Sequence, residues 1–228
     1  IIYVINFLMS SNSKSNENIK NKDRVLNFGE VNTSLREINE MLDLVKNETQ
    51  RLDSRFLEPA CGDGNFLINV LERKLDVLIK KYSQNKYEFE KYGILLVGSI
   101  YGIDILKDNV LKARERLIDK FVQVYKKCFR KNLNRDFIES VKFIVQKNIL
   151  YGDAINFQYV DSDKPLVFSE WSIFKNKIKR RDFVFSELFI YSDFNEPNLF
   201  SEVSEDVEIP PPLKTFPLVN FDKVYETC

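Results

Sequence analysis

Residues 56–67 read F-L-E-P-A-C-G-D-G-N-F-L, and this stretch decides the fold. Two apolar residues end a short predicted strand, an acid and a proline follow, and two glycines precede an apolar run with helical spacing. Glycine permits positive φ and lets a ligand approach the backbone closely. The free N–H groups at a helix start favour polar or anionic groups. The stretch therefore predicts a strand, a glycine turn and a helix that together form a site for a nucleotide-like ligand.

Apolar patterns predict further elements on both sides of this turn. We expect helices at 34–46, 65–81 and 107–131, strands at 55–58, 94–105 and 141–149, and a turn or short helical piece at 82–93. The third strand is expected to end at 150–153. Such alternation is typical of an α/β fold with a parallel, doubly wound sheet, whose ligand lies at the carboxyl ends of the strands.

Composition limits the chemistry. The 228 residues contain no histidine, which excludes Ser-His and Cys-His hydrolases and most metalloenzymes, so we predict no metal. Three widely spaced cysteines fit neither a disulfide framework nor a metal cluster, and this usage favours a cytoplasmic protein. Lys+Arg 34 balances Asp+Glu 34, so any affinity for DNA must come from a local patch or from a partner.

The N-terminal residues do not predict a membrane protein. Residues 1–8 are apolar but too short to span a bilayer, and no basic leading segment precedes them. Met9 is a candidate true start, and the polar run after it predicts a flexible segment over 1–22. We expect no association with a membrane.

The stretch 58–67 resembles the S-adenosylmethionine loop of the adenine-N6 DNA methyltransferases of restriction–modification systems, which reads Asp/Glu-Pro-x-Cys-Gly-x-Gly-x-Phe-Leu. The resemblance extends over about residues 28–155. It implies a Rossmann-like methyltransferase fold, incomplete at its C-terminal end, with a cofactor-binding domain over 23–190 and an irregular acidic, proline-bearing tail over 191–228. It also implies S-adenosyl-L-methionine as cofactor and DNA as partner, bound alone or with a partner subunit.

The resemblance also implies the cofactor-binding residues. They are Thr33, Glu58, Pro59, Ala60, Gly62, Gly64, Asp104 and Asp153. Asp104, 40 residues after Gly64, would accept hydrogen bonds from the ribose hydroxyls, and Asp153 would accept from the adenine amine. Taken alone, Asp104 is more typical of a helix cap or turn residue, and Asp153 is more typical of a simple turn.

The upstream segment 28–34, which contains Thr33, is similar to the family's Gly-Glu-x-Phe-Thr-Pro pattern, and it would contact the methionine part of the cofactor. An ordinary capped helix start is the alternative. Cys61 is interpreted as a packing residue and Trp171 as a core or partner contact. The basic run 175–181 is either a phosphate contact or a solvated face.

The family's catalytic segment, Asp/Asn/Ser-Pro-Pro followed by an aromatic residue, does not occur in the 228 residues. Pro210-Pro211-Pro212 lacks both the polar acceptor and the aromatic, and the segment 182–188 places Ser186 where the acceptor would stand. The catalytic residues therefore stay unknown. The leading hypothesis is an adenine-N6 DNA methyltransferase-like protein. The alternatives are a non-catalytic S-adenosylmethionine-binding or regulatory subunit that acts with a partner methylase, and a methyltransferase for RNA or protein.

Overall fold

The carboxyl ends of three parallel strands meet at one edge of the main sheet. The computed structural model describes residues 2–4, 33–130, 132–192 and 210–227, and within these it forms a five-stranded sheet in the order β1-β2-β3-β4-β5. The strands are β1 (Ile2–Val4), β2 (Arg55–Glu58), β3 (Ile100–Asp104), β4 (Ile149–Asp153) and β5 (Gln158–Tyr159). The first four run parallel and β5 returns antiparallel to β4, which confirms an α/β fold with a largely parallel sheet.

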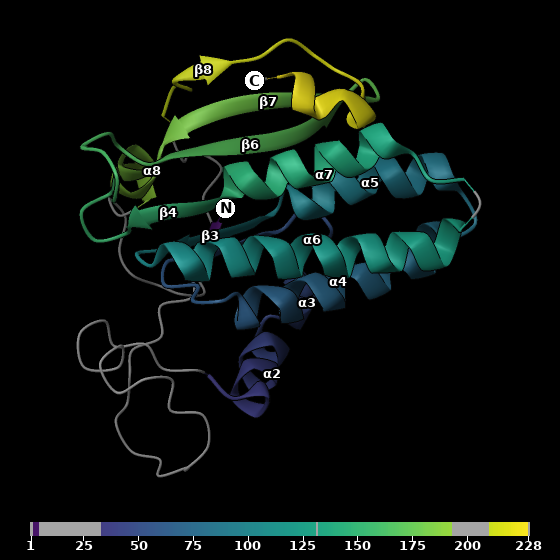
Figure 1. Ribbon diagram of the computed structural model, residues 1–228, viewed down its shortest axis with the longest axis horizontal. Helices are drawn as coiled ribbons and strands as arrows, with labels where there is room; N and C mark the ends of the chain where they lie inside the picture. The colour runs from purple at the N-terminus through teal and green to yellow at the C-terminus, as the bar shows by residue number, and fades with distance from the viewer. Residues whose placement is uncertain (1, 5–32, 131, 193–209, 228) are drawn as a thin grey trace.

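Helices connect and cover these strands. They are α2 (Leu35–Leu44), α3 (Lys46–Thr49), α4 (Asn65–Tyr82), α5 (Lys86–Val97), α6 (Lys107–Phe129), α7 (Arg135–Asn148) and α8 (Phe185–Ser192). Side-chain caps start several of them: Asn85 accepts from the Glu88 N–H, and Asn134 accepts from the Phe137 N–H. In Figure 1 the long helices α4, α5, α6 and α7 pack together, and a β-hairpin lies across α7.

The predicted helices at 65–81 and 107–131 and the strand at 55–58 are confirmed to within a few residues. The strand expected at 94–105 is wrong in its first half, because α5 continues to Val97 and β3 begins at Ile100. Of the residues 82–93, expected as a turn or short helical piece, 86–93 belong to this same helix, and 83–85 connect it to α4. The buried face of α5 is wide and includes polar positions, as Phe89, Glu90 and Lys91 show, so its apolar pattern has no clear helical period.

The strand expected at 141–149 is also wrong. Residues 135–148 form α7, and β4 begins only at Ile149. The buried positions Phe137, Val141, Ile144 and Val145 follow helical spacing, and the Asn134 cap fixes the start of the helix. The β-branched residues in this run favour a strand locally, but helix packing against α5 and α6 prevails.

A second sheet shares no strand with the first but contacts it, and the Tyr101 hydroxyl of β3 donates to the Ser169 carbonyl at 3.0 Å. It consists of β6 (Val167–Phe174), β7 (Lys177–Val184) and β8 (Lys214–Thr215), all antiparallel. A 3-10 helix, η1 (Phe221–Glu226), packs on α7. The described part of the segment 191–228, which we expected to be irregular, therefore contains the end of α8, the short strand β8 and the helix η1. Of the segment 1–22, Ile2–Val4 forms β1, and the rest, including Met9, lies outside the described residues.

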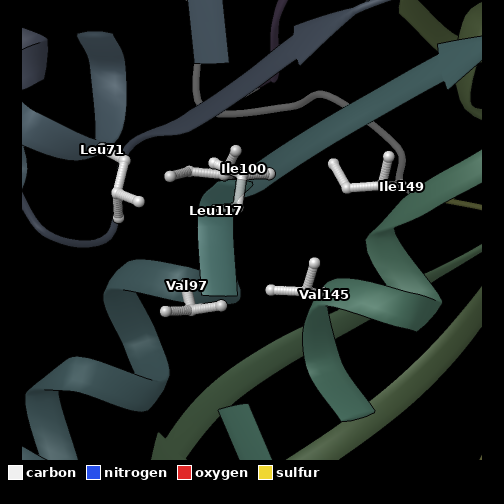
Figure 2. A pocket seen from close by; sticks show the side chains of 6 residues that line it. All are labelled: Leu71, Val97, Ile100, Leu117, Val145 and Ile149. Carbon is white, nitrogen blue, oxygen red and sulfur yellow. The ribbon is translucent and has the colours of Figure 1, made fainter. Parts of the chain in front are cut away.

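The main core lies between the sheet and the helices, with fully buried residues such as Phe56, Leu67 and Phe121. A cavity of about 10 Å³ remains inside it (Figure 2). Its lining is entirely apolar and comprises Leu71, Val97, Ile100, Leu117, Val145 and Ile149. A space this small without polar partners does not hold a ligand, and it lies inside the core rather than at the strand ends. Across the described ranges, no helix combines the length and the apolar character needed to cross a membrane.

Candidate functional site

The glycine turn joins β2 to α4 in a left-handed conformation. Gly62 has φ +53° and Gly64 has φ +86°, values that residues with a side chain rarely adopt. A Cβ added at Gly64 would lie 3.1 Å from the Cβ of Ala113 in α6, so this glycine lets the turn pack against that helix. A Cβ added at Gly62 would meet nothing within 4 Å. The turn is therefore open at Gly62, which is where a ligand could approach the backbone.

Three acids from neighbouring strands lie along the same edge. Strand register pairs Glu58 with Gly102, two residues before Asp104, and pairs Asp104 with Tyr151, two residues before Asp153. The structure thus brings these three predicted residues to adjacent strand ends, as expected for parallel strands.

Of the three acids, Glu58 has the least complete hydrogen bonding. Its Oε2 is buried and has no hydrogen-bond partner in the described part of the chain. Burial, with the nearby charge of Asp104 as a second cause, raises the pKa of Glu58 to about 8. A buried acceptor without a partner typically costs about 1–3 kcal/mol. A cationic or hydrogen-donating ligand group placed against Oε2 would remove that cost.

Asp104 holds the glycine turn in place. One of its carboxylate oxygens accepts from the Gly62 N–H at 2.8 Å. The other accepts from the Leu106 N–H at 2.8 Å and from the Asn109 side chain at 3.3 Å. The carboxylate therefore joins the turn to the start of α6, which is the cap-like role that its sequence position also allowed. A ribose contact would require the bond to Gly62 to be exchanged for a ligand hydroxyl.

Asp153 forms a local turn after β4. Its carboxylate accepts from the backbone N–H groups of Asn156 at 3.1 Å and Ile155 at 2.8 Å, and from the Asn156 side chain at 2.7 Å. The bond from the Asn156 N–H is the main cause that lowers the pKa of Asp153. This geometry matches the turn alternative, although the carboxylate remains at the edge shared with Glu58 and Asp104.

Asp63 and its partners form a clamp that sequence reasoning missed. The carboxylate of Asp63, which is buried, pairs with Lys112 at 2.8 Å and with Arg116 at 3.0 Å. Arg116 also donates to the Asp63 carbonyl at 2.7 Å and to the Asn65 side chain at 2.8 Å. One turn of α6 thus fixes the shape of the glycine turn. The four-residue spacing of Lys112 and Arg116 placed them on one helix face, but nothing in the sequence identified their partner.

The remaining predicted residues divide between packing and capping. Cys61 is buried, and a Cβ on Gly102 would lie 3.0 Å from its Sγ, which supports the packing interpretation. Pro59 and Ala60 belong to the turn, and Ala60 is exposed. Thr33 directly precedes Ser34, whose capping box with Glu37 starts α2, so the capped-helix alternative is realised there.

The other residues singled out in the sequence differ in where they lie, and Phe185, next to Ser186, shares a core cluster with Leu57 and Ile103. Residues 28–32 of the upstream segment lie outside the described residues. Trp171 is a core residue, 3% exposed, and its indole donates to Asn148 at 3.0 Å. Ser186 lies in the first turn of α8. Among the described residues, no group of three or more acidic or cysteine side chains could hold a metal ion.

Comparison with family models, with curated proteins and with solved structures found no match to this chain.

Proposed function

We propose that the chain binds S-adenosyl-L-methionine at the carboxyl edge of β2, β3 and β4, as the cofactor-binding part of a Rossmann-like adenine-N6 DNA methyltransferase of a restriction–modification system. The observation that carries the proposal is the unpaired, buried Oε2 of Glu58, four residues before the open glycine Gly62. This combination suits a ligand that supplies positive charge and lies close to the backbone.

S-adenosylmethionine has the groups that this edge would accommodate. Its α-ammonium and sulfonium are cationic, and a positive charge beside Glu58 favours the ionised carboxylate. In the proposed arrangement the ribose hydroxyls donate to Asp104 in place of Gly62, and the adenine amine donates to Asp153. The Asp63 clamp keeps the turn in shape while Asp104 exchanges partners.

The methyl group would pass directly from the sulfonium to the amine of an adenine base: the S–C bond breaks as the N–C bond forms, the neutral thioether leaves, and the amine loses one proton to solvent. Such a transfer depends on positioning the amine within near-attack distance, and it needs no histidine base. The 228 residues contain no Pro-Pro-aromatic segment to hold the extruded base, so the chain itself offers no catalytic residue that we can name. That absence favours the second candidate, a non-catalytic cofactor-binding or regulatory subunit that acts with a partner methylase.

Calorimetric titration with S-adenosylmethionine tests the proposal. At a ligand concentration 100-fold above the dissociation constant, we expect the free energy of unfolding to rise by about 2.7 kcal/mol. Glu58→Gln should weaken binding, because a neutral amide replaces the counter-charge of the ligand. Binding should be unchanged in Glu139→Gln, a control that removes an exposed carboxylate from α7. A flat titration with folded protein would refute the proposal.

Transfer of labelled methyl groups to unmethylated DNA separates the two candidates. Turnover by the chain alone would identify a complete enzyme, and turnover only with an added partner would identify a split one. Cofactor binding without turnover in either condition would favour the regulatory subunit.

A further inference from the structure

One face of the β6–β7 hairpin is buried along most of its length, and the opposite face is buried only at its base, where Phe168 and Phe183 lie. Arg180 is 4% exposed, pairs with Asp182 at 2.9 Å and lies 5.5 Å from the centre of the Trp171 ring. Its guanidinium also donates to the carbonyl of Thr227, which ties the hairpin to the end of η1. The hairpin therefore packs against α7 and η1, as Figure 1 shows for the backbone.

The opposite face of β7 carries a row of positive charge. Because side chains alternate along a strand, Lys177, Lys179 and Arg181 lie opposite the buried face that contains Arg180. Successive members of this row are about 6.7 Å apart along the strand. Lys177 is exposed and Lys179 half-buried, and neither forms an ion pair within the described ranges.

One acid on β6 is shared between two guanidinium groups. Glu170 lies 2.6 Å from Arg181 and 2.6 Å from Arg55 of β2. This single carboxylate cannot neutralise both arginines, and it does not reach the lysines further along the strand. The net charge of the chain is zero, so the positive row is a local feature of the surface and not a consequence of overall composition.

The tip of the hairpin adds an aromatic group to the row. Lys175 and Asn176 form a two-residue turn with φ of 48° and 63°, the left-handed geometry of tight hairpins. Phe174, immediately before the turn, is 50% exposed, and the Nζ of Lys175 lies 5.4 Å from the centre of its ring. The tip therefore presents a large exposed ring together with cationic groups.

We propose that the outward face of the β6–β7 hairpin binds the phosphate backbone of a nucleic acid, with Lys175, Lys177 and Lys179 as the phosphate contacts. A linear row of cations suits a polymer with regularly spaced anions, and an exposed ring beside that row can stack on an unpaired base. An anionic lipid surface fits less well, because the positive groups follow one strand and are not set around an apolar face. The choice of DNA rests on the proposed function, whereas the surface itself does not.

Binding of a short fluorescent DNA duplex, followed by anisotropy as salt is raised from about 50 to about 200 mM, tests the proposal. Each lysine that contacts a phosphate contributes about 0.9 to the slope of log K against log salt. The triple variant Lys175→Gln, Lys177→Gln, Lys179→Gln should therefore lower the slope by about 2.7 and weaken binding equally for unrelated sequences.

A matched control removes the same charge elsewhere. Lys80→Gln, Lys81→Gln, Lys127→Gln changes exposed lysines of α4 and α6 and leaves the hairpin intact. We expect its salt slope to equal that of the parent chain. An equal loss in both triple variants would refute the local contact, as would failure of the parent to bind DNA. Binding to phosphatidylserine vesicles without binding to DNA would also overturn the assignment.

The same preparations separate this proposal from the proposed function. The hairpin variant should keep the parent's affinity for S-adenosylmethionine, because its substitutions lie far along the chain from the glycine turn and on another sheet. Salt-dependent DNA binding without any cofactor binding would leave the hairpin surface standing and refute the cofactor site. Cofactor binding with no difference in DNA binding between the hairpin and control variants would leave the cofactor site standing and refute the hairpin surface.

Discussion

Glu58→Gln should change how the free energy of unfolding depends on pH. In the folded chain the pKa of Glu58 is raised from 4.5 to about 8, chiefly because the carboxylate is buried. The folded state therefore binds a proton that the unfolded state releases between these two values. Stability from this residue is present below pH 4.5 and is lost as pH rises toward 8.

The magnitude follows from the linkage relation. Each pH unit within the window costs the parent chain at most about 1.4 kcal/mol of stability. Between pH 5.5 and 7.5 the parent chain should lose about 2–3 kcal/mol of stability. A small part of the residue meets solvent, which reduces the loss slightly. The amide introduced by Glu58→Gln has no proton to lose. The free energy of unfolding of the variant should therefore rise by this amount relative to that of the parent as pH rises.

Urea unfolding at several pH values measures the difference. The difference in unfolding free energy between variant and parent should grow steadily across the window, while other titrating groups cancel because both proteins contain them. A difference that stays constant from pH 5.5 to 7.5, within about 0.5 kcal/mol, would show that Glu58 is not held in its protonated form and would refute the reasoning.

Three further predictions concern the site and the core. Binding of S-adenosylmethionine at pH 7 should release close to one proton from the parent chain, because Glu58 ionises, and none from Glu58→Gln; calorimetry in two buffers of different ionisation enthalpy measures this. Gly62→Ala should destabilise the chain by about 1–2 kcal/mol from φ alone, whereas Gly64→Ala should cost more, since its Cβ also meets Ala113; equal urea midpoints would contradict this. Burial lowers the pKa of Lys74 from 10.5 to about 7, so the stability of the parent relative to Lys74→Met should rise with pH between these values, by up to about 1.4 kcal/mol per pH unit. A difference in urea unfolding that does not depend on pH would argue against this.

Local sequence determined the part of the fold that lies around the glycine turn. The apolar pair before Glu58, the two glycines and the helical spacing after them define β2, the turn and α4, because each signal acts within a few residues. The long amphipathic helix α6 was equally clear, since one face is apolar and the other charged. The alternation of strands and helices also predicted a parallel sheet with its site at the carboxyl ends of the strands, where Glu58, Asp104 and Asp153 lie on neighbouring strands.

Tertiary structure decided the elements whose local signals were ambiguous. The first half of the run at 94–105 became the end of α5, and the run at 141–148 became α7. Short apolar runs fit a buried strand and a buried helix equally well, so packing against neighbouring helices made the choice. The strand β1 and the register of β6 with β7 likewise depend on pairing partners rather than on the segments themselves.

The contacts that shape the candidate site were also invisible in the sequence. Asp63 meets Arg116 across 53 residues, and Gly62 meets Asp104 across 42. The residue types at these positions are evident from the sequence. Each contact, however, forms only when the core brings the two distant chain segments together. The sequence alone therefore determined which groups are available at the strand ends. Only the folded structure decided that Asp104 and Asp63 are paired while Glu58 keeps an unpaired oxygen, because those contacts depend on the packing of α6 against the turn.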